Sequence, residues 1–101
     1  MIRHVVMWKF LEHAEGAERA ENLRKAKMLL DELPHKIPQI LEWEAGLNAI
    51  PSDQSHDLVL VSGFADRLAL VAYQEHAEHR RVVGFLRKVH CGRVVVDYER
   101  R

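Results

Sequence analysis

Residues 2–11 read IRHVVMWKFL, a stretch rich in β-branched and large apolar side chains that predicts the first strand of a sheet. The segment VVMW at residues 5–8 gives the strand apolar side chains on both faces. A strand of that kind is buried on both sides and lies in the interior of its sheet. Residues 56–64, HDLVLVSGF, repeat the pattern and predict a second interior strand.

Two further strands complete the predicted sheet. Residues 40–48 alternate apolar side chains with Glu42 and Glu44, which leaves one face polar and suits a strand at the edge of the sheet. Residues 94–98, VVVDY, form the last predicted strand, after a break at Gly92.

Helical periodicity occupies the two long intervals between these strands. After a polar connection over residues 12–16, residues 17–33 place leucine and alanine on one face, and Pro34 ends the helix. Asp66 is positioned to cap a second helix, which is predicted to run from residue 67 to about residue 90.

The order of elements is therefore β-α-β-β-α-β, which predicts a ferredoxin-like α+β fold in a single domain over residues 1–101. Right-handed crossovers would place both helices on one face of a four-stranded antiparallel sheet, with the first and third strands central. The other face would still carry apolar side chains. We expect a second copy of the chain to cover that face, so the predicted partner is the chain itself, as a homodimer through the sheet.

The composition argues against several other classes of partner. Lys plus Arg equals Asp plus Glu at 15 each, so there is no net charge to attract nucleic acid. No apolar run approaches the ~20 residues of a membrane span, and no signal peptide is apparent at the N-terminus. Cys91 is the single cysteine, which fits a reducing compartment, and we expect a cytoplasmic protein.

One face of the second predicted helix combines a histidine with an apolar stripe. His79, Val82, Val83, Leu86 and His90 occupy the i, i+3, i+4, i+7 and i+11 positions. A histidine that faces an apolar interior is either a core residue with a satisfied hydrogen bond or the start of a site. Both interpretations remain open from the residues alone.

The topology brings several polar side chains toward one end of the domain, provided that the strand register turns them inward. They are His4, Tyr73, His76, His79 and Asp97. Asp97 could orient His79 while Tyr73 donates to a developing oxyanion, which is the equipment for proton abstraction next to a carbonyl. Alternatively, Asp97 and His79 only satisfy each other's hydrogen-bonding groups and have a structural role.

A metal site is the competing interpretation of the histidines. His76 and His79 form an i, i+3 pair, and His4 could supply a third ligand. Glu75 and Glu78 are expected to face solvent, however, so no fourth ligand is evident. We therefore predict neither a metal nor a cofactor.

Five short motifs resemble the stress-responsive dimeric α+β barrel family, known as the Dabb domain. They are Ile2-Arg3-His4-Val5-Val6, Lys36-Ile37-Pro38, Ser55-His56-Asp57-Leu58, Tyr73-Gln74-x-His76-x-x-His79 and Val95-Val96-Asp97-Tyr98. They follow one another in the family's order over essentially the whole chain. The resemblance implies a ferredoxin-like monomer whose sheet pairs with that of a partner to form a dimeric barrel.

The family resemblance implies two kinds of function. Some members resemble plant polyketide cyclases, which close poly-β-ketone chains with a helix histidine and a tyrosine and without a cofactor. Carried over, the catalytic residues would be His79 and Tyr73, with Asp97 as partner of the histidine and with His4 and His76 among the ligand-binding residues. Other members are stress-associated proteins, some of which form larger assemblies, and many have no assigned activity. The alternative function is therefore that of a non-enzymatic, stress-related oligomeric or structural protein.

Two positions depart from the family pattern. Ala77 stands where a proline commonly follows the first motif histidine, so the helix is expected to run unbroken through this position. Gln39 stands where a glycine is usual. The fold prediction does not depend on either residue.

Overall fold

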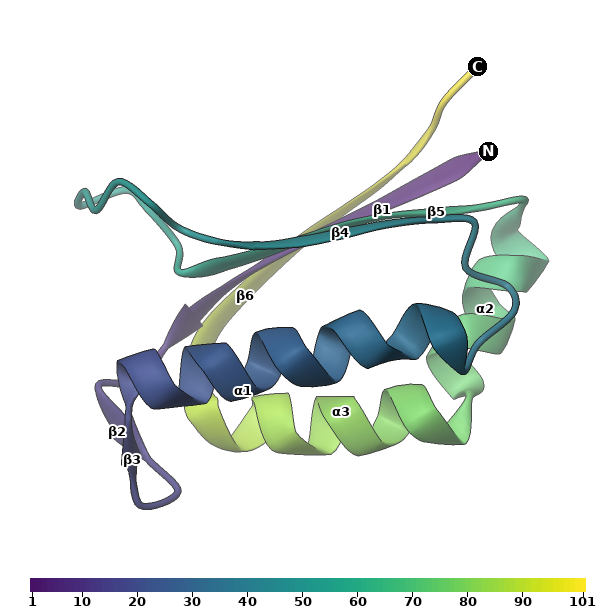
Figure 1. The fold of residues 1–101 in the computed structure, drawn as a ribbon. Coiled ribbons are helices and arrows are strands. Elements are labelled where there is room, and N and C mark those ends of the chain that lie inside the picture. The colour runs from purple at the N-terminus through teal and green to yellow at the C-terminus, as the bar shows by residue number, and fades with distance from the viewer.

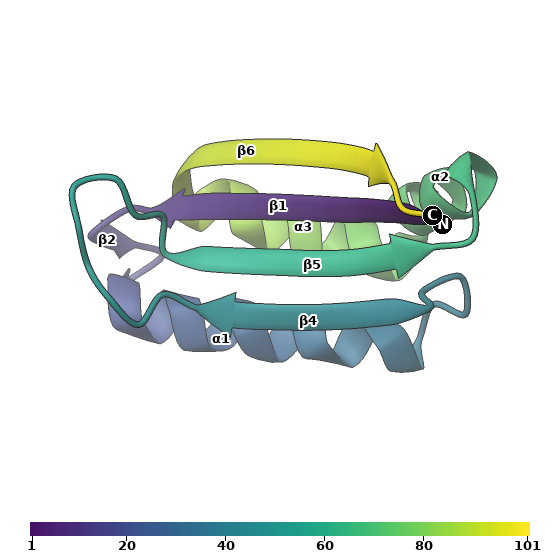
Figure 2. The same cartoon turned by 90° about the horizontal axis from the view of Figure 1, so that it is seen from above.

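The computed structural model describes residues 1–101 as two layers, a sheet and a pair of long helices that cover one of its faces (Figure 1). The sheet is antiparallel and has the strand order β4-β5-β1-β6, which Figure 2 shows from above. Its strands are β1 (Ile2–Phe10), β4 (Glu42–Leu47), β5 (Leu58–Phe64) and β6 (His90–Glu99). The predicted ferredoxin-like fold is confirmed, and the first and third long strands are central as expected.

The helical layer consists of α1 (Arg19–Glu32) and α3 (Ala77–Val89), while α2 (Arg67–Glu75) lies at one end of the sheet (Figures 1 and 2). A short 3₁₀ turn, η1 (Leu33–His35), follows α1, with Pro34 inside it. The α-helix therefore ends at Glu32, just before Pro34, which confirms the predicted end of the helix. None of the helices combines the length and apolar character that crossing a membrane would require.

A small hairpin stands where a plain polar connection was expected. It consists of β2 (His13–Ala14) and β3 (Ala17–Glu18), and it delays the start of α1 to Arg19 instead of residue 17. Glu15 and Gly16 form its turn with φ values of 52° and 73°. Two successive left-handed residues give a turn whose twist matches that of paired strands.

The prediction of one unbroken helix from residue 67 to about residue 90 is wrong. The helix stops at Glu75 and restarts at Ala77, because His76 has an extended backbone with φ −62° and ψ 137°. Nδ1 of His76 accepts a hydrogen bond from the N–H of Glu78 at 3.1 Å and so caps the second helix. This cap satisfies one of the N–H groups that a new helix leaves without a partner.

The last strand also begins earlier than the sequence predicted. It starts at His90, and Gly92, which was predicted to end the helix, lies inside the strand and pairs with Lys9 of β1. The pairing of β1 with β6 shifts register between Lys9 and Phe10, so a bulge accommodates the turn out of α3.

Alternating burial along β1 shows how the sheet sorts its side chains. His4, Val6, Trp8 and Phe10 are buried against the helices, whereas Met7 is exposed on the opposite face. The core between the layers continues with apolar residues of β5 and of the three helices. It includes Leu58, Leu60, Phe64, Ala26, Leu30, Leu70, Val82, Leu86 and Val89.

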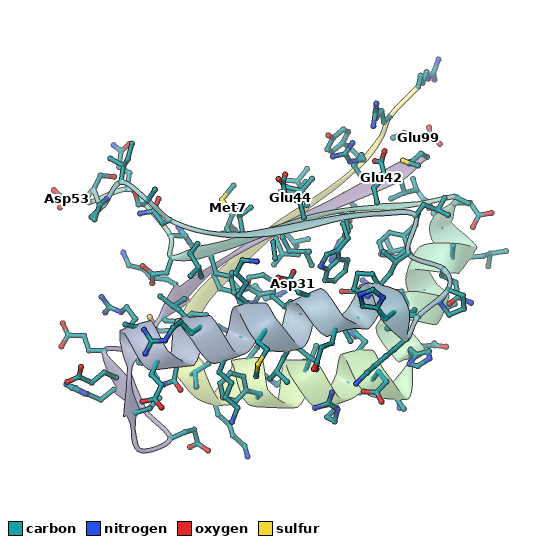
Figure 3. All side chains as sticks on the ribbon, viewed as in Figure 1. Met7, Asp31, Glu42, Glu44, Asp53 and Glu99 are labelled. Atoms are coloured by element: carbon teal, nitrogen blue, oxygen red, sulfur yellow. The ribbon has the colours of Figure 1, made fainter.

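The outer face of the sheet carries the predicted second apolar surface. It comprises Val5, Met7, Val59, Val61, Val94, Val96 and Tyr98, which the strand register aligns side by side. Figure 3 shows Met7 pointing away from the helices. Within one chain these side chains meet solvent, and Val96 is 62% exposed.

Candidate functional site

A cavity of about 410 Å³ lies between the helices and the inner face of the sheet. This is within the range of small-molecule sites. The apolar part of its wall is Val6, Trp8, Leu30, Leu60, Tyr73, Val82, Val83 and Leu86, and the polar part is His4, Gln74, His79, Arg87, His90 and Arg93. All five residues of the predicted helix face, from His79 to His90, line this cavity.

The helix break determines the orientation of His79. Because α2 ends at Glu75, the carbonyl of Gln74 has no helical N–H partner. The Nδ1–H of His79 donates to this carbonyl at 3.0 Å. Since a carbonyl can only accept, Nδ1 is the protonated nitrogen, and Nε2 is left without a partner in the protein.

The break also brings Tyr73 and His79 together. On one continuous helix, residues six positions apart would point about 120° away from each other. In the structure the two rings lie 4.4 Å apart, centroid to centroid, at an interplanar angle of 53°. Both rings therefore line the same cavity.

The surroundings of His79 favour its neutral form. Partial burial is the main reason why the pKa of His79 is lowered. The hydrogen bond to Gln74 opposes this shift, whereas the nearby positive charges of His4, Arg93 and His76 lower the pKa further. At neutral pH the free Nε2 is therefore available as a base.

Tyr73 is held in an aromatic environment. Its side chain is 1% exposed, and its ring lies 4.8 Å from that of Phe64, 6.0 Å from that of Trp43 and 6.2 Å from that of His4. Burial raises its pKa well above the usual range, although the charge of Arg93 acts in the opposite direction. The hydroxyl thus remains protonated, and the structure gives it no hydrogen-bond acceptor within the protein.

Asp97 does not contact His79, contrary to the expectation from sequence. Asp97 faces His4 across the β1–β6 pair, and the Nδ1–H of His4 donates to its carboxylate. His4 is 3% exposed and lines the cavity, whereas Asp97 lies in a separate surface depression with Arg67 and Tyr98. Asp97 therefore acts on the cavity only indirectly, through its hydrogen bond with His4.

His76 lies outside the cavity wall, although it was predicted to bind ligand. Its Nδ1 accepts from the N–H of Glu78 as the cap of α3, so the side chain has a structural partner. The structure does not bring His4, His76 and His79, the ligands of the competing metal interpretation, together into one group, and it has no other group of three metal-binding side chains.

One known protein family matches almost the whole sequence. The sequence model of the Stress Responsive A/B Barrel Domain family, Dabb, matches residues 2–100. The chain belongs to the Dabb family. No curated protein matches this Dabb chain in sequence.

Solved structures with the same fold include two bacterial proteins of unknown function that are described as dimeric and ferredoxin-like. One, from Bacteroides fragilis, is 28% identical at a TM-score of 0.83, with 97% of this Dabb chain and 94% of the other covered. The other, from Jannaschia sp. CCS1, is 29% identical at a TM-score of 0.74, with 97% of each chain covered.

An enzyme also shares the fold. Hydroxynitrile lyase from Passiflora edulis superposes with a TM-score of 0.79 at 14% identity, with 96% of the Dabb chain and 90% of the lyase covered. At this identity the likeness concerns the fold alone.

Sequence reasoning missed two polar residues of the Dabb cavity, Arg87 and Arg93. Arg87 lies eight residues after His79, about 80° around the helix from it. This is within the width of an amphipathic face, so helical spacing could have placed Arg87 on the same face. Arg93 pairs with Trp8 and shares its inward face. That orientation depends on strand register, which the sequence does not determine.

Proposed function

We propose that this Dabb chain binds a small carbonyl compound in its cavity and catalyses acid/base chemistry on it without a cofactor. The observation that carries the proposal is the contact between Tyr73 and His79. An unpaired imidazole Nε2 and an unpaired hydroxyl lie on adjacent rings in the wall of a cavity whose remaining lining is part apolar and part basic. A base and a hydrogen-bond donor in one pocket are suited to enolisation.

The reaction follows from these two groups. Nε2 of His79 removes a proton from the carbon next to a carbonyl, and the electron pair of the C–H bond moves to the carbonyl oxygen. The Tyr73 O–H donates to the resulting enolate oxygen. In a substrate with a second carbonyl, the enolate carbon attacks it, and His79 returns the proton to the new alkoxide. Cyclase-like closure of a poly-β-ketone is one reaction of this class.

Asp97 has a positioning role in this proposal. Its carboxylate accepts from Nδ1–H of the buried His4 and fixes the orientation of the imidazole. Nε2 of His4 is then a second unpaired ring nitrogen on the cavity wall, and the rings of His4 and Tyr73 lie 6.2 Å apart, centroid to centroid. His4 would therefore help to bind the carbonyl substrate.

Closure of heptane-2,4,6-trione to 5-methylresorcinol, with loss of water, tests the catalytic proposal by chromatography. We expect the parent to exceed the buffer rate and His79→Ala to lose about 10²–10⁴-fold in rate, the usual contribution of a general base. Tyr73→Phe removes only the hydroxyl and should lose about 10²–10³-fold.

His35→Ala is the matched control, because His35 is exposed and outside the cavity. A parent rate equal to that of buffer, or a His79→Ala rate equal to that of the parent, would refute the proposal.

We further propose that the chain forms a homodimer through the outer face of its sheet. The support is the exposed apolar surface on β1, β5 and β6 and the dimeric description of the related structures. Val96→Lys places a charge in this surface and should yield monomers in sedimentation experiments.

Met28→Lys is the control for the dimer experiment, because Met28 is an exposed apolar residue of α1, in the helical layer. A dimer that persists in Val96→Lys would contradict the proposed interface. A parent mass well above that of a dimer, without triketone closure, would support the alternative of a non-enzymatic stress-related assembly.

A further inference from the structure

The charged residues of the cavity wall all have one sign. Among its fourteen lining residues there are two arginines and three histidines, and neither aspartate nor glutamate. The carboxylate of Asp97, which pairs with His4, lies outside the wall. A pocket lined in this way attracts and retains negative charge.

Neither arginine is neutralised by the protein. The arginines in ion pairs are Arg3 and Arg100 with Glu42, and Arg81 with Glu78. Arg87 and Arg93 take part in no ion pair and no side-chain hydrogen bond within the chain. Their guanidinium groups therefore keep all their donors for a ligand.

Arg87 and Arg93 line the cavity from adjacent elements, and both side chains are also exposed to solvent. Arg87 lies in the last turns of α3, and Arg93 lies near the start of β6, directly after the chain reverses. Helical side chains lean toward the N-terminus of their helix, so Arg87 leans toward His79. Arg93 lines the same cavity as Tyr73 and His79, and its charge lowers the pKa of both.

We propose that Arg87 and Arg93 bind the carboxylate of the ligand, so that the substrate class is an oxo acid. Arginine matches the planar carboxylate with paired N–H donors. The Cα atoms of His79 and Arg87 are about 12 Å apart along the helix axis, which leaves room for several bonds between the reacting carbonyl and the carboxylate. This inference rests on the proposed function, since it assigns the substrate class of the same site.

Two ligands of the same shape, one with a carboxylate and one neutral, measure how much the negative charge contributes to binding. 5-Oxo-5-phenylpentanoate carries a ketone and a carboxylate, and 5-oxo-5-phenylpentanamide has the same skeleton without the charge. Calorimetric titration of the parent should give at least about tenfold tighter binding of the acid, because charge-assisted hydrogen bonds are stronger than neutral ones.

Arg93→Gln and Arg87→Gln should each reduce this preference, and the double variant should bring the ratio of the two affinities close to one while leaving amide binding unchanged. Arg80→Gln is the control, because Arg80 is an exposed arginine of α3 that does not line the cavity. It removes the same charge from the chain and should keep the preference.

The outcomes separate this inference from the proposed function. Equal binding of acid and amide by the parent would overturn the anion inference and leave the carbonyl chemistry of His79 and Tyr73 standing. A preference that survives in the double arginine variant would also overturn it. If neither probe binds the parent up to its solubility limit, both the anion inference and the ligand-binding role fall.

Discussion

Replacing His79 with asparagine removes the titrating ring while keeping a donor for the Gln74 carbonyl, since the side-chain amide N–H takes the place of Nδ1–H. The pKa of His79 is lowered in the folded protein, mainly by burial, and is about 6.5 in the unfolded chain. Between these two values the unfolded state binds more protons. The parent should therefore lose stability relative to His79→Asn as the pH falls from about 7 through the folded pKa.

The size of this effect has an upper limit. One proton bound only by the unfolded state changes the free energy of unfolding by at most about 1.4 kcal/mol per pH unit. Because His79 is only partly buried, solvent screening reduces the slope below this limit. Above about pH 7.5 both states are unprotonated at this position, and the difference between parent and variant should be constant.

Urea unfolding of both proteins between pH 5 and 8 measures the difference. The protein concentration is kept fixed, because association couples to stability. His35→Asn controls for the loss of one exposed imidazole. A parent that gains stability relative to His79→Asn on acidification would show that the folded pKa is raised, and the assignment of neutral His79 as a base would fail.

Two further substitutions test the backbone and the buried pair. Ala77→Pro should stabilise the protein by about 0.4–1 kcal/mol in urea unfolding. Ala77 is the first residue of α3, and the extended backbone of His76 suits the position before a proline. A marked loss of stability would contradict the observed break. Asp97→Ala should cost about 1–3 kcal/mol, because it leaves the buried Nδ1–H of His4 without its acceptor. An unchanged midpoint for Asp97→Ala would show that the pair contributes little.

Periodicity was enough to predict the fold and one wall of the cavity. Apolar side chains on both faces of residues 2–11 and 56–64 mark interior strands whatever their exact partners are. In the same way, the stripe from His79 to His90 identifies the helix face that lines the cavity. These features depend on spacing within a single element, and spacing is fully present in the sequence.

The helix break could not be predicted in this way. Ala77 is a strong helix former, and the apolar stripe of α3 shows no interruption there. The break depends on His76, which serves as a cap although histidine is not among the preferred N-cap residues. The contact between Tyr73 and His79 exists only because of this break, so the central geometry of the site was hidden from the sequence.

Strand register concealed the remaining polar contacts. His4 meets Asp97, and Trp8 lies beside Arg93, because β1 and β6 pair in one particular alignment. A shift by one residue would turn such side chains to the opposite face. The sequence placed His4 and Asp97 at one end of the domain, but only the alignment shows that they pair with each other.

The net charge of the whole chain does not describe the charge of its cavity. The balance of 15 basic and 15 acidic residues predicted that no net charge attracts nucleic acid, and this stays a prediction. The fold separates these charges, however. Glu42 and Glu44 project from the outer face of the sheet (Figure 3), whereas Arg87 and Arg93 line a cavity without acidic residues. A chain with no net charge can therefore hold a locally positive pocket.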